Sequence, residues 1–442
     1  MRYLKMKIVE QYEKGVIIQK REKLYRIEGV KEKQELKNIT LHDKMLSDID
    51  FENIITNLKN QGIIMDFKQV YIPGYPEVYA FMAPIVCPNG EHPDIAGGIS
   101  LHKNEAIRKT IGESVERYFL FNFKKGNYFI RTSPFKFFDK LNISYFSPHQ
   151  NTSVKQNSIF RVYSGYSLLT GKEIQFPLSF IYTPYKHDSD EDFIGEGTST
   201  GCAAQQSEDL VVLNGIEEVV ERHVNMKIWY HKLYPPKIDI STIRDQEIQK
   251  MISMLEKNGV TLDIFNTTTL NGFSLPSIMI IARNNAGNLN LLVTSSCKAT
   301  LRDALKKSLE EVFQGQTWGF LIKKYPNFKP GRNFKNIKYF YQHILFYAEK
   351  KNEKYMNFLL KSADYEKYYN YSIERSLSSY KKLLQRHGSD CFVFDLKATV
   401  PGFFVKKIFI TNTYLLNRDH NFRFLKLPNN KKPINHYPHP YG

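Results

Sequence analysis

Hydrophobic positions along the chain follow two spacings, which predict strands and helices in alternation. Apolar runs typical of buried strands occur in VYAFMAPIV (78–86), FSLPSIMIIARN (273–284) and LNLLVTSS (289–296). Apolar residues recur every three or four positions, as in amphipathic helices, around residues 111–121, 215–230 and 301–318. Long helices between such strands predict an α+β fold with helices packed on β-sheets.

Residues 1 to about 70 carry a different pattern, which predicts a small N-terminal module. Apolar residues at 16–18 and 24–27 predict two short strands. Ser47 or Asp48 is a plausible N-cap for a helix that Gly62 would end. A strand pair followed by a helix is winged-helix-like, and such a module would suit recognition of a leader peptide. The alternative is an irregular extension packed on a main domain of residues 75–442.

Two stretches near residues 353–369 and 373–387 are rich in Lys and Tyr, and both are predicted to be helical. Together with residues 322–343 they interleave basic and aromatic side chains, as single-stranded nucleic-acid binders do. No RNP-like motif accompanies them, and amphipathic helices with snorkelling lysines show the same pattern. Because that motif is missing, we expect no nucleic-acid partner.

Composition narrows the class of protein. The 442 residues, 42% hydrophobic and 24% charged, are typical of a globular protein of two or three domains. The net charge of +17 suits an anionic partner. The four cysteines form no C-x-x-C pair, which argues against a zinc site or a disulfide scaffold. The chain shows no signal peptide and no apolar run of membrane-spanning length, so we expect a cytoplasmic protein without membrane contact.

The motif Glu-x-x-Glu-Arg occurs twice within the predicted helices, and a related Glu-x-x-Gln occurs in a third. Residues three and four apart share a helix face, so each motif presents its polar groups together. Clustered carboxylates can hold a hard divalent cation, and arginines beside them suit phosphate. Such pairs are also ordinary surface salt bridges, and the repetition favours the binding interpretation. The motif residues are Glu113, Glu116 and Arg117; Glu218, Glu221 and Arg222; and Glu311 with Gln314.

Three ordered motifs and a late strand resemble the YcaO family. The stretch TSTGCAAQQSEDLVVLNGIEEVVERH (198–223) is similar, without gaps, to a family signature that runs into an acidic helix. The stretch GGISLHKNEAIRKTIGESVERY (97–118) resembles the upstream family element. CKATLRDALKKSLEEVFQGQ (297–316) resembles a third helix, and FDLKATVPGFFVKKIFI (394–410) a late strand. The resemblance covers roughly residues 75–442.

The resemblance implies that the three helices bind ATP and Mg²⁺, which agrees with the chemistry read from the residues. It also explains why the chain lacks a Walker-type GxxxxGK[ST] loop. The implied nucleotide-binding residues are the eight motif residues, of which the five glutamates are the implied metal ligands: Glu113, Glu116, Glu218, Glu221 and Glu311.

Several flanking positions depart from the family pattern. Lys109 stands where Ser is usual, and Gly97 where Lys is common. Gln205 and Gln206 replace Gly-Asn, and Leu210 stands where an additional Glu often lies. Lys307 and Gln316 replace Gln and Arg around the third motif. Either the nucleotide is held by an altered set of groups or its binding is weakened.

The chain ends in Pro438-His439-Pro440-Tyr441-Gly442. Alternate prolines stiffen such a tail into an extended strand. A Pro-rich end resembles the azoline-forming branch of the family, in which the terminal carboxylate reaches the active site. The resemblance makes Pro438, Pro440 and Gly442 the candidate catalytic tail, with Gly442 carrying the carboxylate. The tail has little apolar mass, so we expect its removal to change stability by less than about 1 kcal/mol.

The expected function is ATP-dependent cyclodehydration of Cys, Ser or Thr in a ribosomally synthesised precursor peptide, as in bacteriocin and other RiPP biosynthesis. A side chain attacks the preceding backbone carbonyl, the amide oxygen is phosphorylated, and loss of phosphate leaves an azoline. The resemblance implies a leader-binding or ubiquitin-activating-enzyme-like partner protein and a flavin dehydrogenase, and leaves a homodimer open. Two alternatives remain: thioamide or amidine formation by the same backbone activation, and a catalytically weak precursor-binding subunit.

Overall fold

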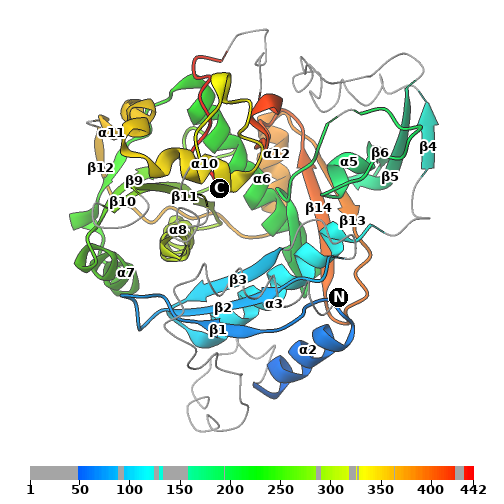
Figure 1. Ribbon diagram of the computed structural model, residues 1–442, viewed down its shortest axis with the longest axis horizontal. Coiled ribbons are helices and arrows are strands. Elements are labelled where there is room, and N and C mark those ends of the chain that lie inside the picture. The colour runs from blue at the N-terminus through cyan, green and yellow to red at the C-terminus, as the bar shows by residue number, and fades with distance from the viewer. Residues whose placement is uncertain are drawn as a thin grey trace.

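The computed structural model describes residues 48–87, 94–123, 129–132, 158–193, 195–284, 290–317, 325, 328–362, 364–423 and 433–442. Within them the chain forms three β-sheets with helices packed on them (Figure 1). The expected α+β fold is therefore confirmed. The two strands expected at residues 16–18 and 24–27 lie outside the described residues.

The first sheet is antiparallel with order β1-β2-β3 and contains the strand expected at residues 78–86. Its strands are β1 (Lys68–Val70), β2 (Tyr79–Pro84) and β3 (Ile95–Ser100). Helices α2 (Asp48–Asn60) and α3 (Lys103–Phe121) share one hydrophobic core with this sheet. Gly62, at φ +67°, follows α2 as the expected stop. Because β1 pairs with β2, the sheet joins residues on both sides of the expected module boundary.

The second sheet has order β11-β10-β9-β8-β12. Only β12 pairs parallel to its neighbour, and the other pairs are antiparallel. Helices α7 (Gln246–Lys257) and α8 (Leu301–Gln316) pack in its core. The strands expected at 273–284 and 289–296 are β10 and β11. The strands are β8 (Lys237–Asp239), β9 (Val260–Asn266), β10 (Ser277–Asn284), β11 (Leu291–Cys297) and β12 (Tyr365–Lys367).

The third sheet has order β4-β5-β13-β14-β7, with β6 paired to β5. The long helix α6 (Glu208–His231) packs against β14 and shares its core. The late strand expected at residues 394–410 is the antiparallel pair β13-β14. The strands are β4 (Phe129–Thr132), β5 (Ile159–Ser167), β6 (Glu173–Pro177), β7 (Cys202–Gln205), β13 (Cys391–Asp395) and β14 (Phe404–Ile410), and the short helix α5 spans Leu178–Ile181.

The helix expected over residues 353–369 is wrong in its second half. The chain forms the 3₁₀ turn η6 (Lys350–Met356) and helix α11 (Asn357–Leu360), and then enters strand β12. The Lys237 N–H donates to the Asp364 carbonyl at 2.8 Å, which draws this segment into the second sheet. The helix expected at 373–387 is confirmed as α12 (Leu377–His387). The other helices of the described residues are η4 (Ile240–Thr242), η5 (Arg332–Phe334), α10 (Phe340–Ala348) and η7 (His420–Phe422).

The C-terminal tail is part of a hydrophobic core, which corrects the expectation that it contributes little apolar mass. Tyr441 is 1% exposed and packs in one cluster with Trp229 and Tyr347. Figure 1 shows the C-terminus in the middle of the molecule rather than at its edge. A single tyrosine among prolines has no periodicity, so the sequence pattern did not reveal this burial. Every helix in the described part of the chain is too short or too polar to cross a membrane.

Candidate functional site

Helices α3, α6 and α8 place their motif residues around one cavity of about 650 Å³. All eight predicted nucleotide-binding residues line it, together with Gly442 at the end of the chain. Backbone and side chains of β3, β7 and β11 complete the wall. Pro438 and Pro440 do not line the cavity; both are buried behind it.

The amphipathic pattern explains why these charged groups meet. In α3, Ile107, Ile111 and Val115 are buried in the core, so the motif face turns the other way. Helix α6 is buried nearly all round, and Glu218 and Arg222 are among its few partly exposed residues. The predicted helical spacing of the motifs is therefore confirmed on three separate helices.

Each arginine lies beside the two glutamates of its own motif. Arg117 is 3.2 Å from Glu113 and 3.9 Å from Glu116. Arg222 is 3.4 Å from Glu221, and its Nε is 3.9 Å from Glu218. On α8, Lys307 pairs with Glu311 at 3.2 Å. Within the described residues no three His, Cys, Asp or Glu side chains converge on a point where they would hold a metal ion. Cationic side chains occupy the carboxylates instead, so a divalent ion would have to displace some of them.

The electrostatics of the cavity fit a cation and an anion bound together. Burial raises the pKa of Glu221 to about 7, aided by the charges of Glu311 and Glu218 and opposed by Arg222. Burial likewise raises the pKa of Glu116, against the effect of Arg117. A raised pKa means that the surroundings of a buried carboxylate hold too little positive charge to stabilise its ionised form. A divalent ion would supply that charge. The buried Nε of Arg222 has no hydrogen-bond partner, and a phosphate oxygen would satisfy it.

Two backbone N–H groups orient the first glutamate of each motif. The Gly97 N–H donates to Glu113 at 2.8 Å, and the Gly201 N–H donates to Glu218 at 3.0 Å. Gly201 has φ +79°, and a Cβ there would lie 2.3 Å from the Ile408 carbonyl oxygen. Only glycine fits this position, because both the left-handed backbone and the close approach exclude a side chain. Gly97, which stands where Lys is common, thus takes part in the wall of the site through its backbone N–H.

The cavity also contains cations that the motif comparison did not assign. Lys109 contacts Glu310 at 2.6 Å and Glu105 at 2.7 Å. Lys298 pairs at 2.8 Å with Glu217, a glutamate that is fully buried. Both lysines stand outside the repeated motif. Lys109 lies one helical turn before Glu113 and shares its face, whereas Lys298 reaches the cavity only through the tertiary fold. The unassigned cations that line it are Arg108, Lys109, Lys298 and Lys307.

Hydrogen bonds from two helices, α6 and α10, fix the backbone of the tail. Trp229 Nε1 donates to the Tyr437 carbonyl at 3.0 Å, and the Tyr347 hydroxyl donates to the Pro438 carbonyl at 2.7 Å. His343 Nδ1 lies 2.9 Å from the His439 carbonyl oxygen. The structure thus holds the buried tail so that its last residue alone is exposed, at the cavity.

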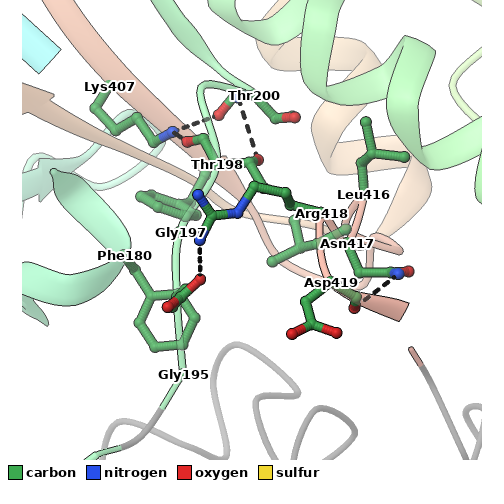
Figure 2. A pocket seen from close by; sticks show the side chains of 13 residues that line it. Phe180, Gly195, Gly197, Thr198, Thr200, Lys407, Leu416, Asn417, Arg418 and Asp419 are labelled. Carbon is green, nitrogen blue, oxygen red and sulfur yellow. Dashed lines mark hydrogen bonds and ion pairs between the residues drawn. The ribbon is translucent and has the colours of Figure 1, made fainter. Parts of the chain in front are cut away.

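A second, smaller pocket of about 40 Å³ lies between Phe180, the turn at Thr198 and Thr200, and the segment of Asn417 and Arg418 (Figure 2). Lys407 of β14 lines it, and its buried ammonium donates to the carbonyls of Thr198 and Thr200 at 2.5 and 2.6 Å. Arg418 also lines the pocket and forms an ion pair with Glu196. Burial lowers the pKa of Lys407, and Glu218 and Glu116 of the larger cavity oppose that effect. Lys407 therefore fixes the turn that leads to the Gly201 N–H.

Comparison with known proteins defines the class to which this fold and cavity belong. The family model described as YcaO cyclodehydratase, ATP- and Mg²⁺-binding, matches residues 97–413. The chain belongs to the YcaO family, and ATP and Mg²⁺ are the cofactors of that family. No curated protein matches the chain by sequence.

Solved structures share the fold at low identity. A heterocyclase in complex with substrate and cofactor superposes with a TM-score of 0.65 at 16% identity, over 88% of this chain and 57% of that one. This chain thus spans little more than half of that protein. YcaO from Methanopyrus kandleri, bound with AMPPCP and Mg²⁺, gives 0.59 at 13% identity, over 84% and 91%. The Escherichia coli microcin synthetase McbBCD complex gives 0.55 at 17% identity, over 75% and 84%.

Proposed function

We propose that the protein is an ATP-dependent cyclodehydratase that converts Cys, Ser or Thr of a ribosomally synthesised precursor peptide into azolines. The observation that carries the proposal is the meeting of all eight motif residues and the terminal Gly442 in one cavity. Five carboxylates, two arginines and a chain terminus are the groups needed for Mg²⁺, phosphate and proton transfer. A structural neighbour is described as a heterocyclase with its substrate, and another as a microcin synthetase with pro-MccB17 bound, which supports a peptide substrate.

The glutamates would hold Mg²⁺, and Arg117 and Arg222 would contact phosphate oxygens. Gln314 has an amide that suits the nucleotide more loosely. When bound, ATP supplies the phosphoryl group that activates the amide oxygen of the peptide. The side chains themselves position and neutralise charge, which is the usual role of protein groups in phosphoryl transfer. Glutamates and guanidinium groups alternate in the cavity. When the nucleotide enters, Mg²⁺ would take the place of an arginine beside a glutamate, and phosphate would take the place of a glutamate beside an arginine.

The terminal carboxylate of Gly442 would act on protons. It is the end of a fixed tail, so its position is defined without the entropy of a free side chain. A carboxylate within reach of the attacking Cys, Ser or Thr can accept its proton as the ring forms. In this proposal, Pro438 and Pro440 fix the direction of the backbone and do not contact the substrate.

Partners and the N-terminal region complete the proposal. A partner protein or residues 1 to about 70 would bind the leader peptide, and a flavin dehydrogenase would oxidise azolines further. Helix α2 and strand β1 lie in the main core, so a truncation that tests leader binding should end before Asp48. If the truncated protein binds precursor as tightly as the full chain, the leader site lies on a partner.

The proposal is tested by incubating the protein with ATP, Mg²⁺, a candidate precursor peptide and its partner proteins. We expect ATP turnover that depends on the precursor, and loss of one water from the peptide per ring, read by mass spectrometry. Replacement of a backbone oxygen by sulfur or nitrogen would instead indicate the thioamide or amidine reaction. Tight precursor binding without ATP turnover would indicate a binding subunit.

A further inference from the structure

One face of helix α6 connects the cavity to the tail. Glu221, Asn225 and Trp229 follow one another at intervals of four residues, so their side chains share a face. Glu221 lines the cavity, while Trp229 donates to the Tyr437 carbonyl of the tail. Asn225 lies between them and is fully buried.

Directed hydrogen bonds join these groups. The Asn225 amide donates to the Ser295 hydroxyl at 2.7 Å, and that hydroxyl donates to Glu221 at 2.9 Å. Because the hydroxyl oxygen accepts from Asn225, its single proton is directed to the carboxylate. From the other side, the Tyr441 hydroxyl donates to the backbone carbonyl of Asn225 at 3.0 Å. All members of this chain are at most 7% exposed, so water does not compete for them.

We propose that Ser295 and Asn225 are positioning residues for Glu221, and that Tyr441 links them to the terminal carboxylate. The inference rests on the proposed function, in which Glu221 binds Mg²⁺. A hydroxyl fixed by Asn225 holds one oxygen of Glu221 and leaves the other for the cation. The same helix turn receives the Tyr441 hydroxyl, so the positions of the carboxylate of Gly442 and of Glu221 are set by one rigid element.

The first test measures the affinity for Mg²⁺–ATP by calorimetry in Ser295→Ala. Loss of a hydrogen bond to a charged group should weaken binding about tenfold or more. Ser295→Thr keeps the hydroxyl and should restore most of the affinity. Ser308→Ala is the matched control: Ser308 is equally buried, its hydroxyl has no hydrogen-bond partner, and it does not line the cavity.

The second test measures the link to the tail with a double-mutant cycle. Tyr441→Phe removes only the hydroxyl and should weaken binding about threefold, since a neutral hydrogen bond is lost. In the double variant Ser295→Ala/Tyr441→Phe, the combined loss should be smaller than the product of the two single losses, because both act through Asn225. Losses that multiply independently would overturn the link between tail and cavity.

The outcomes separate the inference from the function on which it rests. Wild-type protein that binds no Mg²⁺–ATP would overturn the proposed function and the inference with it. If the wild type binds and Ser295→Ala binds equally well, the inference alone is wrong. If Ser295→Ala loses affinity and Ser295→Thr does not regain it, the hydroxyl is not the group that positions Glu221, and the inference is again wrong. Melting temperatures near that of the wild type show that each variant is folded.

Discussion

Arg222 lines the large cavity and Lys407 lines the small pocket of Figure 2, and these two cations have different partners. In the cavity, Arg222 faces two carboxylates, and its Nε remains without a hydrogen bond. In the pocket, the Lys407 ammonium donates to two backbone carbonyls, which are neutral. Carboxylates can exchange an arginine for a metal ion, whereas carbonyls of a folded turn keep their donor. The first arrangement suits binding and the second suits structure.

The largest expected effect comes from Arg222→Ala, because it removes a phosphate partner from the cavity. We expect precursor-dependent turnover to fall about a thousandfold, as on loss of a group that stabilises developing charge. Glu218→Ala and Glu221→Ala should have comparable effects. Arg283→Ala is the control, since Arg283 is also ion-paired, at 2.8 Å to Asp263, but lies outside the cavity. Near-wild-type turnover in Arg222→Ala would show that the motif residues in the cavity form only structural salt bridges.

The same contrast explains how much the sequence could predict. The spacing of Glu113, Glu116 and Arg117 follows the helical period, so their shared face was predictable without the fold. Lys407 and Lys298 have no periodic relation to the motifs. Lys298 lines the cavity directly after β11, and Lys407 lies beside the turn before β7 because β14 pairs with β7. The partners of Tyr441 likewise come from the tertiary structure, so its burial was missed although the role of the tail was proposed.

The tail should contribute to both stability and catalysis, and two variants separate these contributions. Tyr441→Ala removes a fully buried ring and should destabilise the protein by about 3–5 kcal/mol, measured by denaturant unfolding. A short extension after Gly442 keeps the ring but displaces the carboxylate. The extended protein should lose about 10²–10⁴-fold in turnover with little change in melting temperature. An extended protein with full activity would contradict a catalytic role for the terminus.

Lys407→Met should act on stability more than on chemistry. The substitution keeps the length of the side chain but leaves the carbonyls of Thr198 and Thr200 without their donor, at a cost of about 1–3 kcal/mol. Turnover should fall less than in Arg222→Ala, because Lys407 does not line the cavity. Lys406→Met is the control: Lys406 is also buried, and its ion pair with Glu208 is 3.4 Å long. Equal unfolding free energies for the two variants would contradict a structural role for Lys407.

The smallest expected effect concerns pH and the histidines that hold the tail. Burial lowers the pKa of His343 to about 4, against the effect of the carbonyls of His439 and Arg418. The ring of His439 stacks on it at 4.0 Å, and burial lowers its pKa as well. His420 lies 6.4 Å from His343, and the same cause lowers its pKa to about 2.

A histidine whose folded pKa lies below its unfolded value binds fewer protons in the native state. Its contribution to stability is present above about pH 6.5 and is lost as the pH falls toward the folded pKa. Between pH 7.5 and pH 6 we expect His343 to account for a loss of about 1 kcal/mol, measured by chemical denaturation at each pH. His343→Gln should flatten this part of the profile, while His102→Gln, at a side chain that is 68% exposed, should leave it unchanged. A profile that is the same in all three proteins would show that His343 does not couple the tail to pH.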